Sequence, residues 1–219
     1  MIGAGLRRNE CMNEPMLLAV PALMILDYLL TIAGARLHDD GYGRHFMIAH
    51  YELNPAFQRV VAARRWFSAR HLALVVLFAV LLVAFDQWLL RGHRALAAAF
   101  AGALVTIFVA VNARHLSNLA IFAYVRRHPG SLSGSVRMSH LLVLWMSAAQ
   151  TLLVIVPVAV VAATTRHPFA LGAFAGSAAF ALAHLVWYRR AQRSPQGQRD
   201  DGAEHEEVHE RVGDRPDRP

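Results

Sequence analysis

Apolar residues fall in five long blocks along the chain, and most charged residues lie between them. The blocks cover residues 16–35, 71–90, 95–113, 141–163 and 169–187. At a rise of about 1.5 Å per residue, a block of about twenty residues crosses the roughly 30 Å hydrocarbon core of a bilayer. Because no water reaches the backbone there, each block is predicted to form a helix. The pattern therefore predicts an all-α, polytopic transmembrane helical bundle of about five spans, in a single domain over residues 1–193.

The segments between the blocks add further elements. The helical pattern of the third block continues through residues 112–127, and the glycines of residues 130–134 predict a turn. In the long first loop, Asn54 and Pro55 are suited to start a helix. Residues 56–70 mix apolar side chains with four arginines, which predicts an interfacial amphipathic helix on anionic lipid. The charged tail, residues 194–219, has no apolar periodicity and is predicted to be disordered.

Composition supports a membrane protein and argues against a nucleic-acid partner. Hydrophobic residues make up 56% of the chain, charged residues 17%, and the mean hydropathy is +0.34. The formal net charge is +7, but all 22 basic residues are arginines and most lie in loops or at block ends, as membrane topology requires. Cys11 is the only cysteine, so an intramolecular disulfide is excluded.

The distribution of arginines predicts an orientation. Most lie in the first loop, between the third and fourth spans, and after the fifth span, whereas the opposite side has five. The positive-inside rule then predicts an N-terminus outside and a C-terminus inside, in the cell (inner or plasma) membrane. Arg7 and Arg8 run against this orientation and precede the first block as in a signal peptide. The length of that block, with Asp27 inside it, favours a retained span.

Asp27 is the first candidate for function, because an ionisable side chain inside a span is costly unless it is paired. Thr31 lies one turn further along the same helix face. Glu52 follows in the first loop, and a helix cap at Asn54 does not account for its carboxylate. Packing and function both remain open for Asp27. If Asp27 and Glu52 act together they must lie within one cavity, because direct pairing acts over about 4–6 Å.

The third helix contributes Asn112, His115 and Asn118, which are spaced three apart and so lie on one side. Tracing the spans in alternation places a larger polar set towards the same leaflet. Its members are Asp27, Thr31, Glu52, Asn54, Asn112, His115, Asn118, His140 and His184. This one-sided set predicts a cytoplasm-facing pocket or half-channel rather than a complete pore.

Two short motifs carry a resemblance. Asp27-Tyr-Leu-Leu-Thr31, followed by Glu52-Leu-Asn54-Pro55, resembles a family of small prokaryotic membrane proteins of unknown function with an Asp-x-x-x-Thr and then a Glu-x-Asn-Pro pattern. The resemblance covers residues 16–90 at most, and this chain departs from it by a long His- and Asp-rich insert between the motifs. It implies no activity, but it marks these polar residues as a set.

Two further motifs have simpler explanations. His205-Glu206-Glu207-Val208-His209 has the H-E-x-x-H zinc spacing, but it lies in the charged tail, with nothing apolar to build a cleft. The first-loop histidines and acids match no metal motif, so neither a metal site nor a cofactor is assigned. Gly172-x-x-x-Gly176 allows close helix approach, either within the chain or in a homo-oligomer.

Three classes of function remain open. The first is a non-enzymatic membrane protein, such as a small transporter, an ion- or proton-coupled carrier or an accessory subunit, in which Asp27 and Glu52 bind a cation or proton. The second is an intramembrane enzyme, metal-dependent or acid–base, that uses Asp27, Glu52 and His115. The third is a scaffold that holds anionic lipid at its basic loop. The sequence favours the first class over an enzyme.

Overall fold

The computed structural model describes residues 14–48, 51–52, 57–88 and 92–193. Five helices in these residues are long and apolar enough to cross a membrane, which confirms the predicted all-α membrane bundle. They are α1 (Glu14–Asp39), α3 (Ala69–Trp88), α4 (Arg94–Arg127), α5 (His140–Thr165) and α6 (Pro168–Gln192). Asn54, Pro55 and the tail with the H-E-x-x-H sequence lie outside the described residues.

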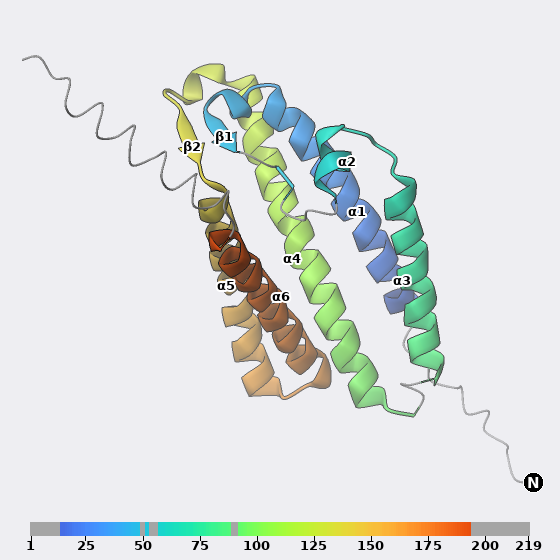
Figure 1. The fold of residues 1–219 in the computed structure, drawn as a ribbon. Coiled ribbons are helices and arrows are strands. Elements are labelled where there is room, and N and C mark those ends of the chain that lie inside the picture. The colour runs from blue at the N-terminus through green and yellow to red at the C-terminus, as the bar shows by residue number, and fades with distance from the viewer. Residues whose placement is uncertain (1–13, 49–50, 53–56, 89–91, 194–219) are drawn as a thin grey trace, which may run out of the picture.

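The helices form a row with α4 at its centre (Figure 1). α4 packs against α1 on one side and against α6 on the other, while α3 packs on α1 and α5 packs on α6. Successive helices alternate in direction, so α1 begins and α6 ends at opposite ends of the bundle. We call the end that carries the first loop, the α4–α5 connection and the last turn of α6 the loop end.

The predicted extension of the third helix is confirmed, since α4 is a single helix of 34 residues. At about 1.5 Å per residue it is roughly 50 Å long, which exceeds the hydrocarbon core of a bilayer. Its last turns therefore continue beyond the predicted span towards the loop end. Prolines lie inside two other helices, Pro21 in α1 and Pro157 in α5, without ending them.

Small residues determine how closely α4 and α6 approach each other. A Cβ atom added at Gly172 would overlap the carbonyl group of Ala99, and one added at Gly176 would lie 2.7 Å from Ala103 Cα. The glycine pair thus packs against α4 of the same chain, as close-packed membrane helices do. A homo-oligomer through Gly172 and Gly176 stays a prediction.

Two short strands meet at the loop end, a feature that the sequence did not predict. They are β1 (Phe46–Ile48) and β2 (Val136–Met138), each preceded by a 3-10 turn, η1 (Tyr42–Arg44) and η2 (Pro129–Ser131). The strands run parallel, with Phe46 opposite Val136 and Ile48 opposite Met138. The predicted turn before β2 includes Gly134, whose φ of 79° suits glycine. The strand pair joins the connection after α1 to the connection before α5.

The helix expected over residues 56–70 is shorter in the structure, where α2 covers Gln58–Ala62. The chain turns at Arg64, which has a left-handed φ of 51°. Val61 of α2 is buried against Tyr28 and Ile32 of α1. α2 is therefore anchored to the bundle by an apolar contact, and lipid binding by the basic loop stays a prediction.

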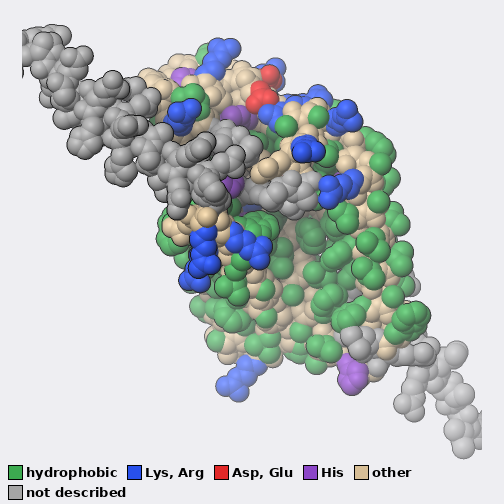
Figure 2. Space-filling view, viewed as in Figure 1, with side chains coloured by type: hydrophobic (Ala, Val, Ile, Leu, Met, Phe, Trp, Pro, Cys, Tyr) green, Lys and Arg blue, Asp and Glu red, His purple; other side chains and the backbone are tan. Residues whose placement is uncertain are grey.

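Apolar and basic side chains are separated along the bundle. Figure 2 shows apolar side chains over the body of the molecule and most arginine side chains at the loop end. Arg126 and Arg127 end α4 there, and Arg189 and Arg190 lie in the last turn of α6. The arginines are thus concentrated at one end of the bundle, as the arginine count along the sequence predicts.

Candidate functional site

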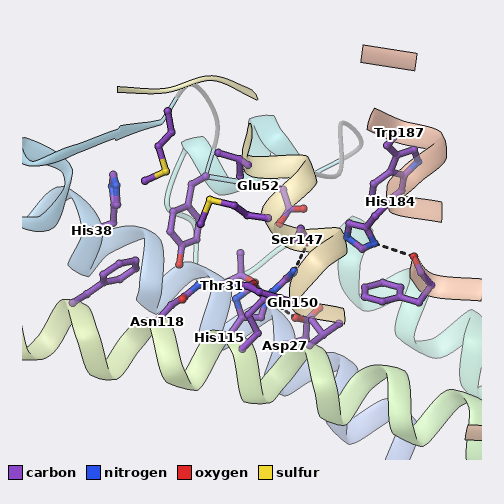
Figure 3. A pocket seen from close by; sticks show the side chains of 18 of the residues that line it. Asp27, Thr31, His38, Glu52, His115, Asn118, Ser147, Gln150, His184 and Trp187 are labelled. Atoms are coloured by element: carbon purple, nitrogen blue, oxygen red, sulfur yellow. Dashed lines mark hydrogen bonds and ion pairs between the residues drawn. The ribbon is translucent and has the colours of Figure 1, made fainter. Parts of the chain in front are cut away.

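A cavity of ≈ 460 Å³ lies along α4, between α1 on one side and α5 and α6 on the other. Its polar lining includes Asp27, Thr31 and His38 from α1, Tyr51 and Glu52 from the first loop, Arg114, His115 and Asn118 from α4, Ser147 and Gln150 from α5, and His184 from α6. Figure 3 shows the labelled side chains converging on one space from these separate elements. Six members of the predicted polar set therefore line one cavity, namely Asp27, Thr31, Glu52, His115, Asn118 and His184.

Within this cavity Asp27 is paired with His115. Asp27 Oδ1 lies 3.1 Å from His115 Nε2, and the two side chains are 28% and 13% exposed. The contact is an ion pair when the imidazole carries a proton, and its partial shielding then makes the attraction stronger than on an open surface, because water screens it less. The ionisable residue of the first span thus has a defined partner on α4.

Thr31 joins this pair through the same nitrogen atom. Its Oγ1 lies 3.4 Å from His115 Nε2. In a nucleophile–base–acid relay, the hydroxyl and the carboxylate contact opposite nitrogens of the imidazole. Here both contact Nε2, and within the described residues His115 Nδ1 is buried without a hydrogen-bond partner. The three side chains form a cluster, but not a relay that would activate the Thr31 hydroxyl.

Arg114 brings a permanent positive charge to the same cavity, since a guanidinium stays protonated in proteins. It donates a hydrogen bond to Ser147 Oγ of α5 and interacts electrostatically with Asp27 and Glu52. Arg114 is a polar residue of the third helix that was not among the predicted site residues.

Asn112 differs from the other predicted residues of α4. Its Nδ2 donates hydrogen bonds to Leu23 O at 3.1 Å and to Phe108 O at 2.8 Å. A buried amide needs hydrogen-bond partners, and Asn112 finds one of them on α1. Its side chain therefore links α4 to α1. His115 and Asn118 line the cavity, whereas Asn112 faces α1.

Aromatic side chains line the loop end of the cavity. Tyr42 stacks on Phe46 with ring centroids 4.5 Å apart and also contacts Phe122 of α4. His38 Nε2 lies 3.2 Å from Phe46 O. Since Phe46 of β1 and Met138 of β2 both line the cavity, the strand pair forms part of its wall.

Tyr51 lies beside both the aromatic and the charged groups. Its hydroxyl occupies the space that a side chain at Gly34 of α1 would need. Burial raises the pKa of Tyr51 to about 12, although Arg114 acts in the opposite direction. The hydroxyl is therefore neutral at physiological pH, and within the described residues it is buried without a hydrogen-bond partner.

A second cavity, of ≈ 210 Å³, borders Asp27 towards α3 and the first loop. Asp27, Thr31 and Glu52 line both cavities. His71 of α3 lines the smaller one and interacts electrostatically with Asp27. Asp27 and Glu52 thus share a cavity, which is the condition for the two residues to act together. Both residues also border the second cavity.

Metal-ligating side chains are scattered rather than grouped in the described part of the chain. No set of three or more His, Cys, Asp or Glu residues there is placed to hold a metal ion. Asp39, in the His- and Asp-rich segment, pairs with Arg64 at 2.7 Å. The site consists of hydrogen-bonding and acid–base groups.

Comparisons with known proteins find no match: no family model, no curated protein and no solved structure matches this chain. The likeness at Asp27 to Pro55 therefore remains one of short motifs. The fold and the cavity define the class instead, which is a multi-pass helical membrane protein with an ionisable cavity between its spans.

Proposed function

We propose that this protein is a proton-linked carrier of a small solute in the cell's inner or plasma membrane. The observation that supports it is the Asp27–His115 pair, which lies within spanning helices and borders two cavities through Asp27. Ionisable residues in spans are costly and are typical of proton relays and substrate pathways. A proton-linked carrier needs an ionisable group that contacts more than one cavity, as Asp27 does here.

Ionisable neighbours would link the protonation of this pair to solute binding. They are Arg114 on α4, Glu52 and Tyr51 in the first loop, His71 on α3 and His184 on α6. Protonating Asp27 ends its attraction to His115 and removes a negative charge near Arg114. Because any ligand in the cavity feels both changes, proton and solute affinities must be coupled, and the coupling is reciprocal.

We further propose that the loop end faces the cytoplasm, with the N-terminus outside and the C-terminus inside. The arginines at the loop end support this orientation (Figure 2). In a Cys11→Ser background, Thr164→Cys should react with an impermeant maleimide on intact cells, whereas Ser131→Cys should not. The reverse labelling pattern would contradict the orientation.

The two alternatives have less support. The second class is an enzyme that uses Asp27, Glu52 and His115. Thr31 adds no nucleophile relay to these groups, because Thr31 and Asp27 contact the same nitrogen of His115. A scaffold accounts for the packing of Asn112 but not for an open cavity that exposes Asp27, Glu52 and Arg114 together.

Proteoliposomes with a trapped pH-sensitive dye test the carrier. A pool of small organic acids, amines, amino acids and sugars is added outside, and the internal pH is followed. The wild-type protein should move protons when the pool is added, and Asp27→Asn should lose this movement while keeping its helical circular dichroism. Thr164→Ser, an exposed change at the opposite end, is the matched control. No solute-dependent proton movement in the wild type, or equal movement in Asp27→Asn, would overturn the proposal.

A further inference from the structure

Several arginine side chains gather at the loop end over α1, α2 and the start of α3 (Figure 2). Residues 57–70, which contain α2 and the start of α3, hold four arginines and no acidic residue. α1 adds Arg36 in its last turn. Asp39 pairs with Arg64 at 2.7 Å and offsets one of these charges. The surface therefore keeps a net positive charge where two spanning helices end.

The turn between α2 and α3 is held in place by contacts with α1. Tyr28 Oη donates a hydrogen bond to Arg65 O at 2.7 Å, and the Arg36 guanidinium donates one to Arg64 O at 2.8 Å. The same guanidinium lies 4.7 Å from the centre of the Trp66 ring, which is a cation–π contact. These contacts give this basic surface a fixed local geometry.

Aromatic side chains are exposed at the same turn. Trp66 and Phe67 are exposed, and so are Arg36 and Arg65 beside them. We call these four residues the α2–α3 patch. Aromatic rings are favoured at the membrane–water interface, where they contact both headgroups and acyl chains. Because the spanning helix α3 begins at Ala69, the patch lies at the level where the chain enters the bilayer.

α3 continues from this patch with an apolar face that the described residues leave uncovered. The helix lies at one end of the row and packs on α1 (Figure 1). Leu77, Val80 and Leu81 are exposed, and their spacing of three and four residues places them on one side of the helix. The surface thus combines a basic, aromatic end with an apolar stripe. This combination fits a molecule with an anionic head and long apolar chains better than it fits a free anion.

We propose that the α2–α3 patch binds the headgroup of an anionic phospholipid. The guanidinium groups of Arg36 and Arg65 bind its phosphate, Trp66 and Phe67 lie at the level of the headgroup, and the acyl chains lie along the exposed face of α3. A guanidinium binds phosphate through two parallel hydrogen bonds, and a basic cluster beside a span attracts anionic lipid. This inference rests on the surface and does not depend on the proposed carrier function.

Native mass spectrometry of the full chain in detergent micelles tests the inference. The protein is titrated with dioleoylphosphatidylglycerol and, separately, with dioleoylphosphatidylcholine, which has the same acyl chains and no net charge. The wild type should bind the first anionic lipid at least about fivefold more tightly, because each arginine near an anionic headgroup contributes a factor of about five. Inorganic phosphate in large excess should not displace this lipid, because it has no acyl chains to contact α3.

Variants locate the binding site. Arg36→Gln combined with Arg65→Gln should weaken binding of the anionic lipid about tenfold or more and leave phosphatidylcholine binding unchanged. Replacing the same two residues by lysine should keep the preference at lower affinity, because an ammonium lacks the bidentate geometry of a guanidinium. The matched control is Arg189→Gln combined with Arg190→Gln, which removes two exposed arginines from the last turn of α6 at the same end of the bundle.

Each outcome supports or overturns the proposal. Equal affinities for the two lipids overturn it, as does an equal loss of affinity in the two glutamine double variants, which would show a general effect of net charge. Displacement by inorganic phosphate would assign the patch to a soluble anion and also overturn the lipid. If the first double variant does not fold, Arg65→Gln alone is compared with Arg190→Gln, because it leaves the contacts of Arg36 with Arg64 and Trp66 in place.

Discussion

A double-mutant cycle can measure the interaction energy between Asp27 and His115. Asp27→Asn and His115→Gln, made singly and together, remove each charge while they keep a polar side chain of comparable reach. If the two side chains attract, each single variant should lower the free energy of unfolding. The double variant should then lower it by less than the sum of the two, because the second change removes an interaction that is already lost.

The structure gives the expected size of the effect. Two unit charges at the observed 3.1 Å attract by about 5 kcal/mol at an effective dielectric constant of about 20. Desolvation and the 28% exposure of Asp27 offset part of this attraction. We therefore expect a coupling energy of about 1–3 kcal/mol.

Unfolding by SDS in mixed micelles, followed by circular dichroism, supplies the four free energies. The matched control is a cycle on Asp40 and Arg126, which are 3.3 Å apart but 51% and 59% exposed. Surface pairs of this kind contribute about 0–1 kcal/mol. A coupling for Asp27 and His115 no larger than that of the control would refute a stabilising Asp27–His115 pair. It would also remove the main support for a proton-linked carrier.

Two further predictions use the same unfolding measurement. Gly172→Ala should destabilise the protein by about 1–3 kcal/mol, because its Cβ would overlap Ala99 of α4. Gly130→Ala, with no atom within 4 Å of the new Cβ, should be near neutral, and equal stabilities would contradict the close α4–α6 contact. Burial raises the pKa of Tyr51 to about 12, so the folded state holds the phenolic proton more tightly than the unfolded chain. The resulting stability is present below about pH 10 and is lost as pH rises towards 12. Tyr51→Phe should reduce that loss, and an equal loss in the variant would show that Tyr51 is not its source.

Properties that depend on local sequence were predictable here. Each spanning helix satisfies its own backbone, so a run of about twenty apolar residues suffices to predict it. The long α4 was predictable for the same reason, because its helical pattern continues to Arg127 without a break. Asp27, Thr31 and His115 also lie on the same leaflet side by counting along alternating spans, and the structure places them in contact.

Properties that depend on contacts between distant segments were not predictable. The strand pair places Phe46 opposite Val136, and segments of only three residues are too short to be identified as strands from their pattern. Ser147 has no distinctive sequence context, and only the packing of α4 and α5 against the shared neighbour α6 brings it to Arg114. Asn112 has the same spacing on α4 as His115 and Asn118, but the rotation of α4 against α1 turns it away from the cavity.

The position of the cavity follows from how α4 and α6 are packed along their length. Near the end opposite the loop end, Gly172 and Gly176 allow α6 to touch Ala99 and Ala103 of α4. Further along the same two helices the side chains are larger, both apolar and polar, and they line the cavity. In the proposed carrier, the contact at Gly172 and Gly176 thus closes the solute path at one end of the bundle. The mouth of the cavity leaves the path open at the loop end. A carrier that releases its solute across the membrane must separate the closed side, so a substitution that locks this contact should stop transport without preventing binding.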